Sequence, residues 1–356
     1  MNDAAPPSKD PKRRASTARR GVRTADLPPA DPIGGVESVK LFERAFAGRK
    51  SALLAVSGGA DSTALLVLAG EWFQTGGAPK IAVATVDHGL REEARAEADA
   101  VEALAGRFGL PFARLDGRTA PRDTRIEETA RVSRYGALLA HARSIGADAV
   151  ATAHTLDDQA ETVLMRLSAG SGPMGLAAMR HAVRRDGIEL LRPFLVVPKA
   201  RLVATLKARN LGWAEDPMNV DPRFARARLR SARGALEREG MTAERLGVLA
   251  FRMARVNAAI EAAIDQAAAL HVARKNGVSV IGASAATLPD EIKLRLLGRV
   301  IAEIGGVRVK LERLERLADH IVTKSSGANT LAGARIAWDS EGAIKVSSAP
   351  PRRERR

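Results

Sequence analysis

The chain has 356 residues, 46% of them hydrophobic, which is enough to bury a core and excludes a chain disordered throughout. It contains no cysteine, which excludes disulfides, cysteine-ligated zinc, iron–sulfur clusters and any thiolate or persulfide mechanism of the protein itself. The 56 Lys and Arg residues outnumber 41 Asp and Glu residues, giving a net charge of +15. This excess favours a polyanionic partner such as RNA or DNA, although arginine-rich tails can also be solvated surface.

Two terminal segments are predicted to lie outside the folded domains. Residues 1–45 are rich in Pro, Ala and Arg and predict a disordered basic arm, and residues 349–356 predict a basic tail. The start of the arm has no apolar stretch of the kind that a secretory signal needs, and its aspartates argue against an organelle transit peptide. No apolar run approaches the ~18 residues of a membrane span. The cytoplasm is therefore the expected location, and the oligomeric state is left open.

From residue 51 onward, short apolar runs typical of strands alternate with helical patterns. Strands are predicted at 52–56, 81–86, 112–115, 149–153 and 188–197, and helices at 63–73, 92–108, 126–144, 157–167, 198–211 and 224–239. The last of these helices is strongly basic. The alternation predicts an α/β domain over residues 46–235, built on a doubly wound parallel sheet. Ligands of such sheets bind beyond the carboxyl ends of the strands.

A second, smaller and mainly helical domain is predicted over residues 241–348. Helical patterns cover 243–273, 289–304 and 311–322, and a β-hairpin is predicted from 334–338 and 343–346.

The first strand leads into a loop with the composition of a phosphate site, Ser57-Gly58-Gly59-Ala60-Asp61-Ser62, and then into a helix. Two glycines allow a sharp turn that points successive backbone N–H groups inward, and the helix adds its positive N-terminal end. Ser57 and Ser62 can donate hydroxyl hydrogen bonds. Asp61 would be repelled by a bare phosphate, so we expect Mg²⁺ between them. The spacing differs from the Walker loop.

Three carboxylates gather where the fourth strand passes into a helix. Asp157, Asp158 and Glu161 fall beside the stripe of Ala160, Val163, Leu164 and Leu167, which is predicted to be buried. Clustered carboxylates repel one another unless a cation lies among them, so a second Mg²⁺ ligand or a site for a substrate ammonium is expected. The alternative is that these acids only complement the helix dipole.

Several segments resemble known families. The loop 57–62 is similar to the S-G-G-x-D-S loop of the N-type ATP pyrophosphatases, which transfer AMP to a carbonyl or carboxylate oxygen. Residues 152–162 resemble the T-A-H-H-x-D-D-Q-A-E-T motif of one branch, the tRNA(Ile)-lysidine synthetases. Further likenesses to that branch lie at 86–91, 127–135, 170–176, 192–195 and 213–228. The chain departs from the pattern at Thr155, Met218 and Ala227, which stand for a usual His, Ser or Thr, and Asn.

The resemblance implies an adenine nucleotide α-hydrolase-like fold and a set of site residues. Catalytic roles fall to Asp61, Asp158, Glu161 and His154, and metal binding to Asp61 and Asp158. ATP would be bound by Ser57, Gly58, Gly59, Ala60, Asp61, Ser62, Asp87, His88, Arg131 and Arg134. The other substrates would be bound by Asp157, Arg192, Asp216, Asn219, Arg226 and Arg228. For His88 and His154 a turn role is equally open, and Arg131, Arg134 and Arg192 can be solvated or paired.

The activity implied by the resemblance is ATP-dependent joining of free L-lysine to the wobble cytidine of a CAU-anticodon isoleucine tRNA. The 241–348 domain carries many basic residues, and we expect it to bind the backbone of the tRNA. A tRNA thiolase on the same fold is disfavoured because that chemistry normally uses protein cysteines. A small-molecule amide or guanidine former is opposed by the basic balance. A non-catalytic RNA-binding protein with a degenerate ATP site is opposed by the complete loop and carboxylate motifs.

Overall fold

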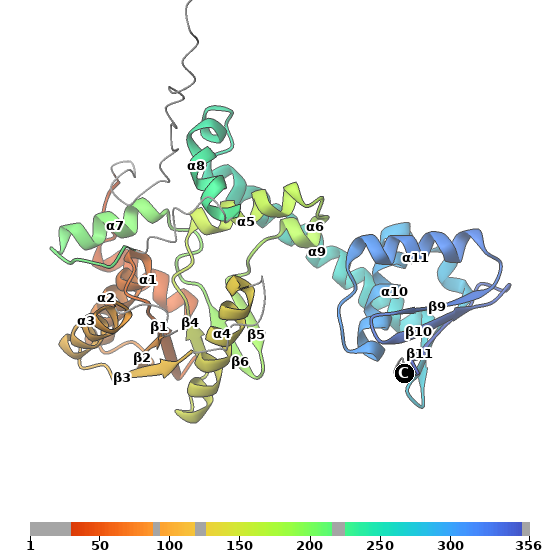
Figure 1. The fold of residues 1–356 in the computed structure, drawn as a ribbon, viewed down its shortest axis with the longest axis horizontal. Helices are drawn as coiled ribbons and strands as arrows, with labels where there is room; N and C mark the ends of the chain where they lie inside the picture. Colours follow the sequence, from red (N-terminus) through yellow and green to blue (C-terminus); the bar gives the residue numbers. More distant parts are fainter. Residues whose placement is uncertain (1–29, 88–92, 118–125, 216–224, 351–356) are drawn as a thin grey trace, which may run out of the picture. The chain divides into compact units, whose positions relative to one another are not determined.

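The computed structural model describes residues 30–87, 93–117, 126–215 and 225–350, without the side chains of 93–94 and 126–131. The chain divides into two compact units, Met1–Met253 and Ala254–Arg356. Figure 1 shows the elements of each. None of the helices in the described ranges combines the length and apolar character that a membrane crossing requires.

The first unit is built on a six-stranded sheet with the order β3-β2-β1-β4-β6-β5. All neighbouring pairs are parallel except β5 with β6. The strands are β1 (Ser51–Ala55), β2 (Lys80–Asp87), β3 (Phe112–Asp116), β4 (Ala149–Ala151), β5 (Ala182–Arg185) and β6 (Ile188–Leu191). The chain reverses its direction of progress across the sheet between β1 and β4, which is where open α/β sheets bind ligands. The parallel sheet expected from the sequence is confirmed.

Helices of the first unit follow the strands in alternation. They are α1 (Gly35–Ala45), α2 (Ala60–Gln74), α3 (Glu93–Arg107), α4 (Ile126–Ser144), α5 (Leu156–Ser168), α6 (Pro173–Leu176), α7 (Lys199–Ala208) and α8 (Ala225–Arg238). Helix α9 (Ala243–His271) begins in this unit and ends in the second. Side chains of β1 such as Leu53 and Leu54 are fully buried, as expected for a strand covered on both faces.

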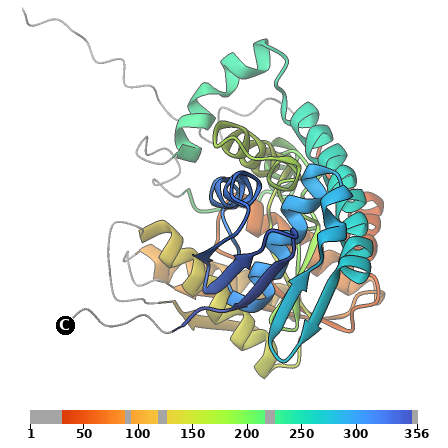
Figure 2. The same cartoon turned by 90° about the vertical axis from the view of Figure 1, so that its right-hand side faces the viewer.

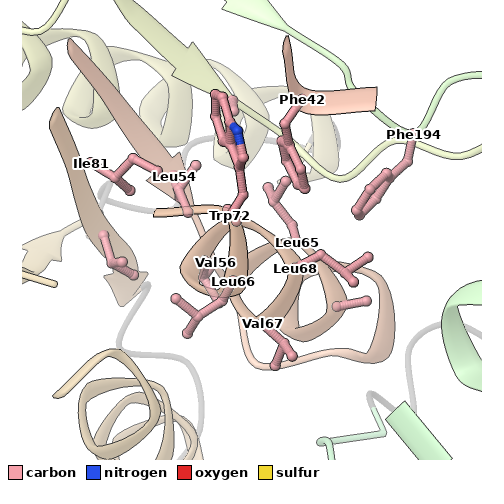
Figure 3. Packing of buried hydrophobic residues seen from close by; sticks show 14 of the residues in the cluster. Phe42, Leu54, Val56, Leu65, Leu66, Val67, Leu68, Trp72, Ile81 and Phe194 are labelled. Carbon is pink, nitrogen blue, oxygen red and sulfur yellow. The ribbon is translucent and has the colours of Figure 1, made fainter. Parts of the chain in front are cut away.

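Helix α1 corrects the prediction of a disordered arm over residues 1–45, which is wrong for residues 35–45. Phe42 of α1 stacks on Trp72 of α2 with ring centroids 5.4 Å apart, and Phe194 meets Phe42 edge-on at 6.0 Å. Figure 3 shows these three rings beside the leucines of α2. The burial of these rings outweighs the Pro, Ala and Arg composition on which the prediction of disorder rested, because large rings remove much apolar area from water.

The second unit packs helices on one face of an antiparallel five-stranded sheet with the order β7-β8-β11-β10-β9. Its strands are β7 (Val272–Lys275), β8 (Val278–Ile281), β9 (Gly327–Leu331), β10 (Ala334–Trp338) and β11 (Ile344–Ser348). The helices are the end of α9, the short η3 (Ala283–Thr287), α10 (Asp290–Gly305) and α11 (Leu311–Thr323). The predicted hairpin is present as β10 and β11, but β7, β8 and β9 were not predicted. Figure 2 shows the strands of this sheet side by side.

The predicted start of the second domain at residue 241 is earlier than the division at residue 254. The first turns of α9 pack on α5, where Ala243, Leu246 and Ala250 join Leu156 and Val163 in one buried cluster. A Cβ at Gly247 would lie 2.6 Å from Cδ1 of Leu156, so any larger residue at position 247 would require the Leu156 side chain to move.

Candidate active site

The loop between β1 and α2 is held by its own serine and threonine side chains. The backbone N–H of Ser57 donates to Oγ of Ser62 at 3.1 Å, and the Ser62 hydroxyl donates to the Gly59 carbonyl at 3.0 Å. The Thr63 hydroxyl donates to the Gly58 carbonyl at 3.1 Å. Gly58 has φ +86°, a left-handed conformation that favours glycine. Ser62 is therefore buried and internally bonded, whereas Ser57 is exposed.

Gly59 caps the N-terminus of α2, and Ala60 begins the helix. The N–H of Ala214 donates to the Gly58 carbonyl at 2.9 Å, and Gly59 and Ala214 form an isolated parallel bridge. Ala214 thus lies beside the loop, and the predicted Asp216 and Asn219 lie outside the described ranges.

Asp61 stands in the first turn of α2 with its two carboxylate oxygens in different situations. Oδ2 lies 3.0 Å from Nζ of Lys199, the first residue of α7. Oδ1 is buried without a hydrogen-bond partner. Burial raises the pKa of Asp61 to about 6, and the charges of Asp158 and Asp157 act in the same direction, while Lys199 opposes them. A buried unpaired carboxylate oxygen is a place for a cation.

The three carboxylates of α5 bind different partners. Asp158 completes a capping box, because its Oδ2 accepts the backbone N–H of Thr155 at 2.9 Å and the Thr155 hydroxyl accepts the N–H of Asp158. Asp157 accepts the N–H of Lys199 at 2.7 Å. Thr155, a departure from the family pattern, therefore has a defined role as a helix cap. Nδ1 of His154 lies 2.8 Å from Oγ1 of Thr152.

The cations beside these carboxylates come from α8. Arg230 forms a fork with Glu161, Nε to Oε1 at 2.5 Å and Nη2 to Oε2 at 3.2 Å, and its Nη2 lies 3.7 Å from Oδ1 of Asp158. Arg233 binds Asp157 and also Glu237. The expected cation among the carboxylates is thus supplied, in this structure, by the protein itself.

The pKa values of the two inner carboxyls move in opposite directions. Burial raises the pKa of Glu161, and the Arg230 guanidinium only partly offsets it. Burial also disfavours the charge of Asp158, but His154, the Thr155 N–H and Arg230 together hold its pKa below the ordinary value. One carboxyl that keeps its proton more readily than its neighbour suits proton transfer to or from an amine.

The buried stripe of α5 differs from the prediction. Leu167 is 53% exposed, whereas Glu161 is only 8% exposed and lies among the buried residues. The prediction placed Glu161 off the packed face because it assumed that only apolar residues are buried. The fork with Arg230 allows a charged side chain to be buried there.

Other predicted site residues lie apart from the carboxylates or make different contacts. Arg192 is buried and donates from Nη1 to the Arg180 carbonyl at 2.6 Å. Asp87 ends β2, and Arg134 is exposed on α4. The charge of Arg226 lowers the pKa of Asp158 and of Glu161, whereas Arg228 is exposed on α8. His88 and the side chain of Arg131 lie outside what the structure describes.

Three cations of this site were missed by the sequence reasoning, namely Lys199, Arg230 and Arg233. Lys199 follows β6 of the parallel sheet, and residues beyond the carboxyl ends of such strands are candidates for a ligand site. The spacing of Arg230 and Arg233 places them on one helix face. Within the described residues no three His, Cys, Asp or Glu side chains form a metal-binding group. Mg²⁺ beside nucleotide phosphates needs only one or two carboxylates, so Asp61 fits that role.

The sheet, its switch between β1 and β4 and the loop before α2 define the class of an ATP-using PP-loop domain. Residues 36–233 match the family model described as PP-loop domain. The chain is 48% identical to a tRNA(Ile)-lysidine synthase of Methylobacterium nodulans over 85% of this chain and 91% of that protein. It is 44% identical to one of a Bradyrhizobium species over 91% of this chain and 97% of that protein. The chain therefore belongs to the tRNA(Ile)-lysidine synthase family.

A solved structure shares the fold. The U34-tRNA thiolase NcsA of Methanococcus maripaludis, which carries a [4Fe-4S] cluster, matches with a TM-score of 0.51 and 16% identity, over 62% of this chain and 78% of that one. At this identity the likeness concerns the fold alone. The absence of cysteine in this chain leaves no ligands of the kind that hold such clusters.

Proposed function

We propose that this chain joins L-lysine to the 2-position of the wobble cytidine of a CAU-anticodon isoleucine tRNA, with ATP converted to AMP and pyrophosphate, in the cytoplasm. The observation that carries the proposal is that Asp61 and the carboxylates of α5 are close enough for their charges to interact. The aspartate of the phosphate loop has one buried oxygen without a partner, and the charges of Asp157 and Asp158 raise its pKa. This arrangement supports a nucleotide site beside a site that would receive an amine.

In the first step, the 2-carbonyl oxygen of the cytosine attacks the α-phosphorus of ATP, and the bond to the β-phosphate oxygen breaks to release pyrophosphate. The backbone N–H groups around Gly58 and Gly59 and the N-terminus of α2 bind phosphate oxygens. Asp61 would hold Mg²⁺, which supplies neutralisation of phosphate charge when bound. Lys199 lies at the same carboxylate and adds a positive charge.

In the second step, the ε-amine of lysine attacks C2 of the cytosine, and the bond to the AMP oxygen breaks. The amine is a nucleophile only after it loses a proton, so a base must stand near it. Glu161 suits this role because burial raises the pKa of its carboxyl, while Asp158 stays charged and can hold the ammonium. Arg230 now occupies both carboxylates, so lysine must share them with the guanidinium or displace it.

The second unit would bind the tRNA, since the wobble base is a small target and a methionine tRNA with the same anticodon must be rejected elsewhere. The test supplies ATP, Mg²⁺, labelled lysine and individual tRNA transcripts. We expect label only in the CAU isoleucine species, with one AMP formed for each lysine incorporated. AMP formation with no lysine incorporation into any tRNA would contradict the proposal.

A further inference from the structure

The five-stranded sheet of the second unit has one face covered and one uncovered. Helices α10 and α11 lie on the covered side, as Figure 1 shows, and α10 contacts β8, β10 and β11. The side chains that point to them, such as Ile336, Val346 and Ile281, are buried. Because successive residues of a strand point to opposite faces, the residues between them form the other face.

The register of the strands places three cations on this other face. Lys345 of β11 pairs with Val280 and Ala337, and Arg335 of β10 pairs with Thr330 and Ser347. Lys275 of β7 pairs with Val278. All three cations are exposed. We name Lys275, Arg335 and Lys345 the sheet-face cations.

The residues around the sheet-face cations are small or neutral. Across the sheet, the residues paired in register with these cations form two rows on the uncovered face. The other positions of the two rows are alanine, valine, serine or threonine, so neither row contains a carboxylate or an aromatic ring. The cations reach from β7 to β10, three strand spacings or about 14 Å. Short side chains leave the surface flat, and long lysine and arginine side chains stand above it.

Some other cations of this unit differ from these three because they are paired with carboxylates. Arg274, the neighbour of Lys275 on β7, binds Glu303 at 3.0 Å. Lys293 binds Asp290 at 2.8 Å, and Arg295 binds Glu291 at 2.8 Å. Among the described residues, the sheet-face cations form no ion pair. The charges of Arg274, Lys293 and Arg295 are thus neutralised within the unit, whereas those of the uncovered sheet face are available to a partner.

We propose that the uncovered face of this sheet binds the phosphate backbone of the tRNA, an inference that rests on the proposed function. A flat surface with cations over about 14 Å and no acid between them complements a polyanion. The lack of aromatic side chains on it removes the means to stack bases, so the contact is with phosphates and fixes position rather than reads sequence.

The experiment uses the full chain with two of the sheet-face cations removed, Arg335→Ala with Lys345→Ala. Its matched control is Arg274→Ala with Lys293→Ala, which removes the same charge from residues that are already paired. Binding of the CAU isoleucine tRNA is measured from 50 to 200 mM salt. We expect the sheet variant to bind roughly tenfold more weakly at low salt and to lose about 2 from the slope of log K against log salt.

The control variant should keep the slope of the parent protein, because its charges do not meet the RNA. Equal affinity and slope in the sheet variant and the parent overturn the proposal. So does an equal loss in both variants, which would show that only net charge matters. Lysine incorporation by the parent protein is measured in parallel. If no lysine is incorporated but tRNA binding still depends on Arg335 and Lys345, the proposed function is wrong and the proposal that the sheet face binds tRNA is supported.

Discussion

The ammonium of Lys199 lies 3.0 Å from Oδ2 of Asp61, although 138 residues separate the two in the sequence. Lys199 also donates its backbone N–H to Asp157, so one residue contacts both the phosphate loop helix and the carboxylate helix. The ion pair leaves Oδ1 of Asp61 buried and unpaired.

Replacing Asp61 by Asn should abolish adenylylation, because the shape is kept while the charge that would hold Mg²⁺ is lost. We expect pyrophosphate release in the presence of tRNA to fall by at least about 10²-fold, with folding intact. Turnover and circular dichroism are measured on the same sample. Near-normal turnover of the variant would remove Asp61 from the mechanism.

The same variant tests the pKa of Asp61 through stability. The folded pKa is raised from 3.8 to about 6, so Asp61 stabilises the fold below pH 3.8 and this contribution is lost as the pH rises through 6. Asn does not titrate. Between pH 4 and 7 the free energy of unfolding of the Asn variant should therefore gain up to about 3 kcal/mol relative to the parent. Urea unfolding at both pH values measures it, and a constant difference would show an ordinary pKa.

Replacing Lys199 by Met should shift the pH dependence of the reaction. Lys199 lowers the pKa of Asp61, so its removal raises that pKa further and keeps the carboxyl protonated to higher pH. The acidic limb of the activity profile should move upward by about one pH unit. Lys207→Met, at the exposed far end of the same helix, is the control and should leave the profile in place.

Glu161→Gln and Glu71→Gln form a matched pair. Each glutamate receives a fork from one arginine, Arg230 for Glu161 and Arg209 for Glu71, with Nε donating to Oε1 at 2.5 and 2.6 Å. Both changes should lower stability, on the order of 1–3 kcal/mol, and Glu161→Gln should do so more, because the Glu161 side chain is 10% exposed and that of Glu71 is 35% exposed. Only Glu161→Gln should abolish lysine incorporation per folded molecule, and equal incorporation by the two variants would give Glu161 a structural role alone. Asp158→Asn should behave like Glu161→Gln.

Removing the second unit should separate ATP binding from tRNA binding, provided that the cut leaves the first turns of α9 packed on α5. A chain ending at Met253 keeps Leu246 and Ala250 on α5, and it should bind ATP while its apparent KM for tRNA rises and its salt dependence flattens. A chain ending at Glu239 exposes that apolar cluster and should be less stable. Unchanged tRNA affinity and isoleucine preference in the longer chain would assign another role to the second unit.

Most of the first unit could be predicted because strands such as β1 are apolar runs and helices such as α2 and α4 are long. The edge strand β5 could not, since all of its residues are exposed and no alternation marks it. Strand β7 was absorbed into the helix predicted at 243–273, because Val272 and Ala273 continue the apolar pattern of α9 without a break.

The site was predictable where the chemistry is local in sequence. Asp61 and the α5 carboxylates stand in short motifs with a physical meaning. Their partners are not local: Arg230 lies 69 residues from Glu161, and a basic helix shows from its sequence only that it is basic. Which face of α8 meets α5 is decided by packing, which no periodicity encodes.

Helix α7 connects the segment around α1 to the candidate active site. It starts with Lys199, and two of its residues bind the segment around α1: Arg201 forms an ion pair with Glu37, and Oγ1 of Thr205 accepts the N–H of Ile33 at 2.8 Å. A protein trimmed back to the first strand, as the sequence alone would suggest, would keep every motif residue. It would lose the contacts that help to hold Lys199 beside Asp61, so a substitution of Glu37 should lower the rate of the ATP-dependent step.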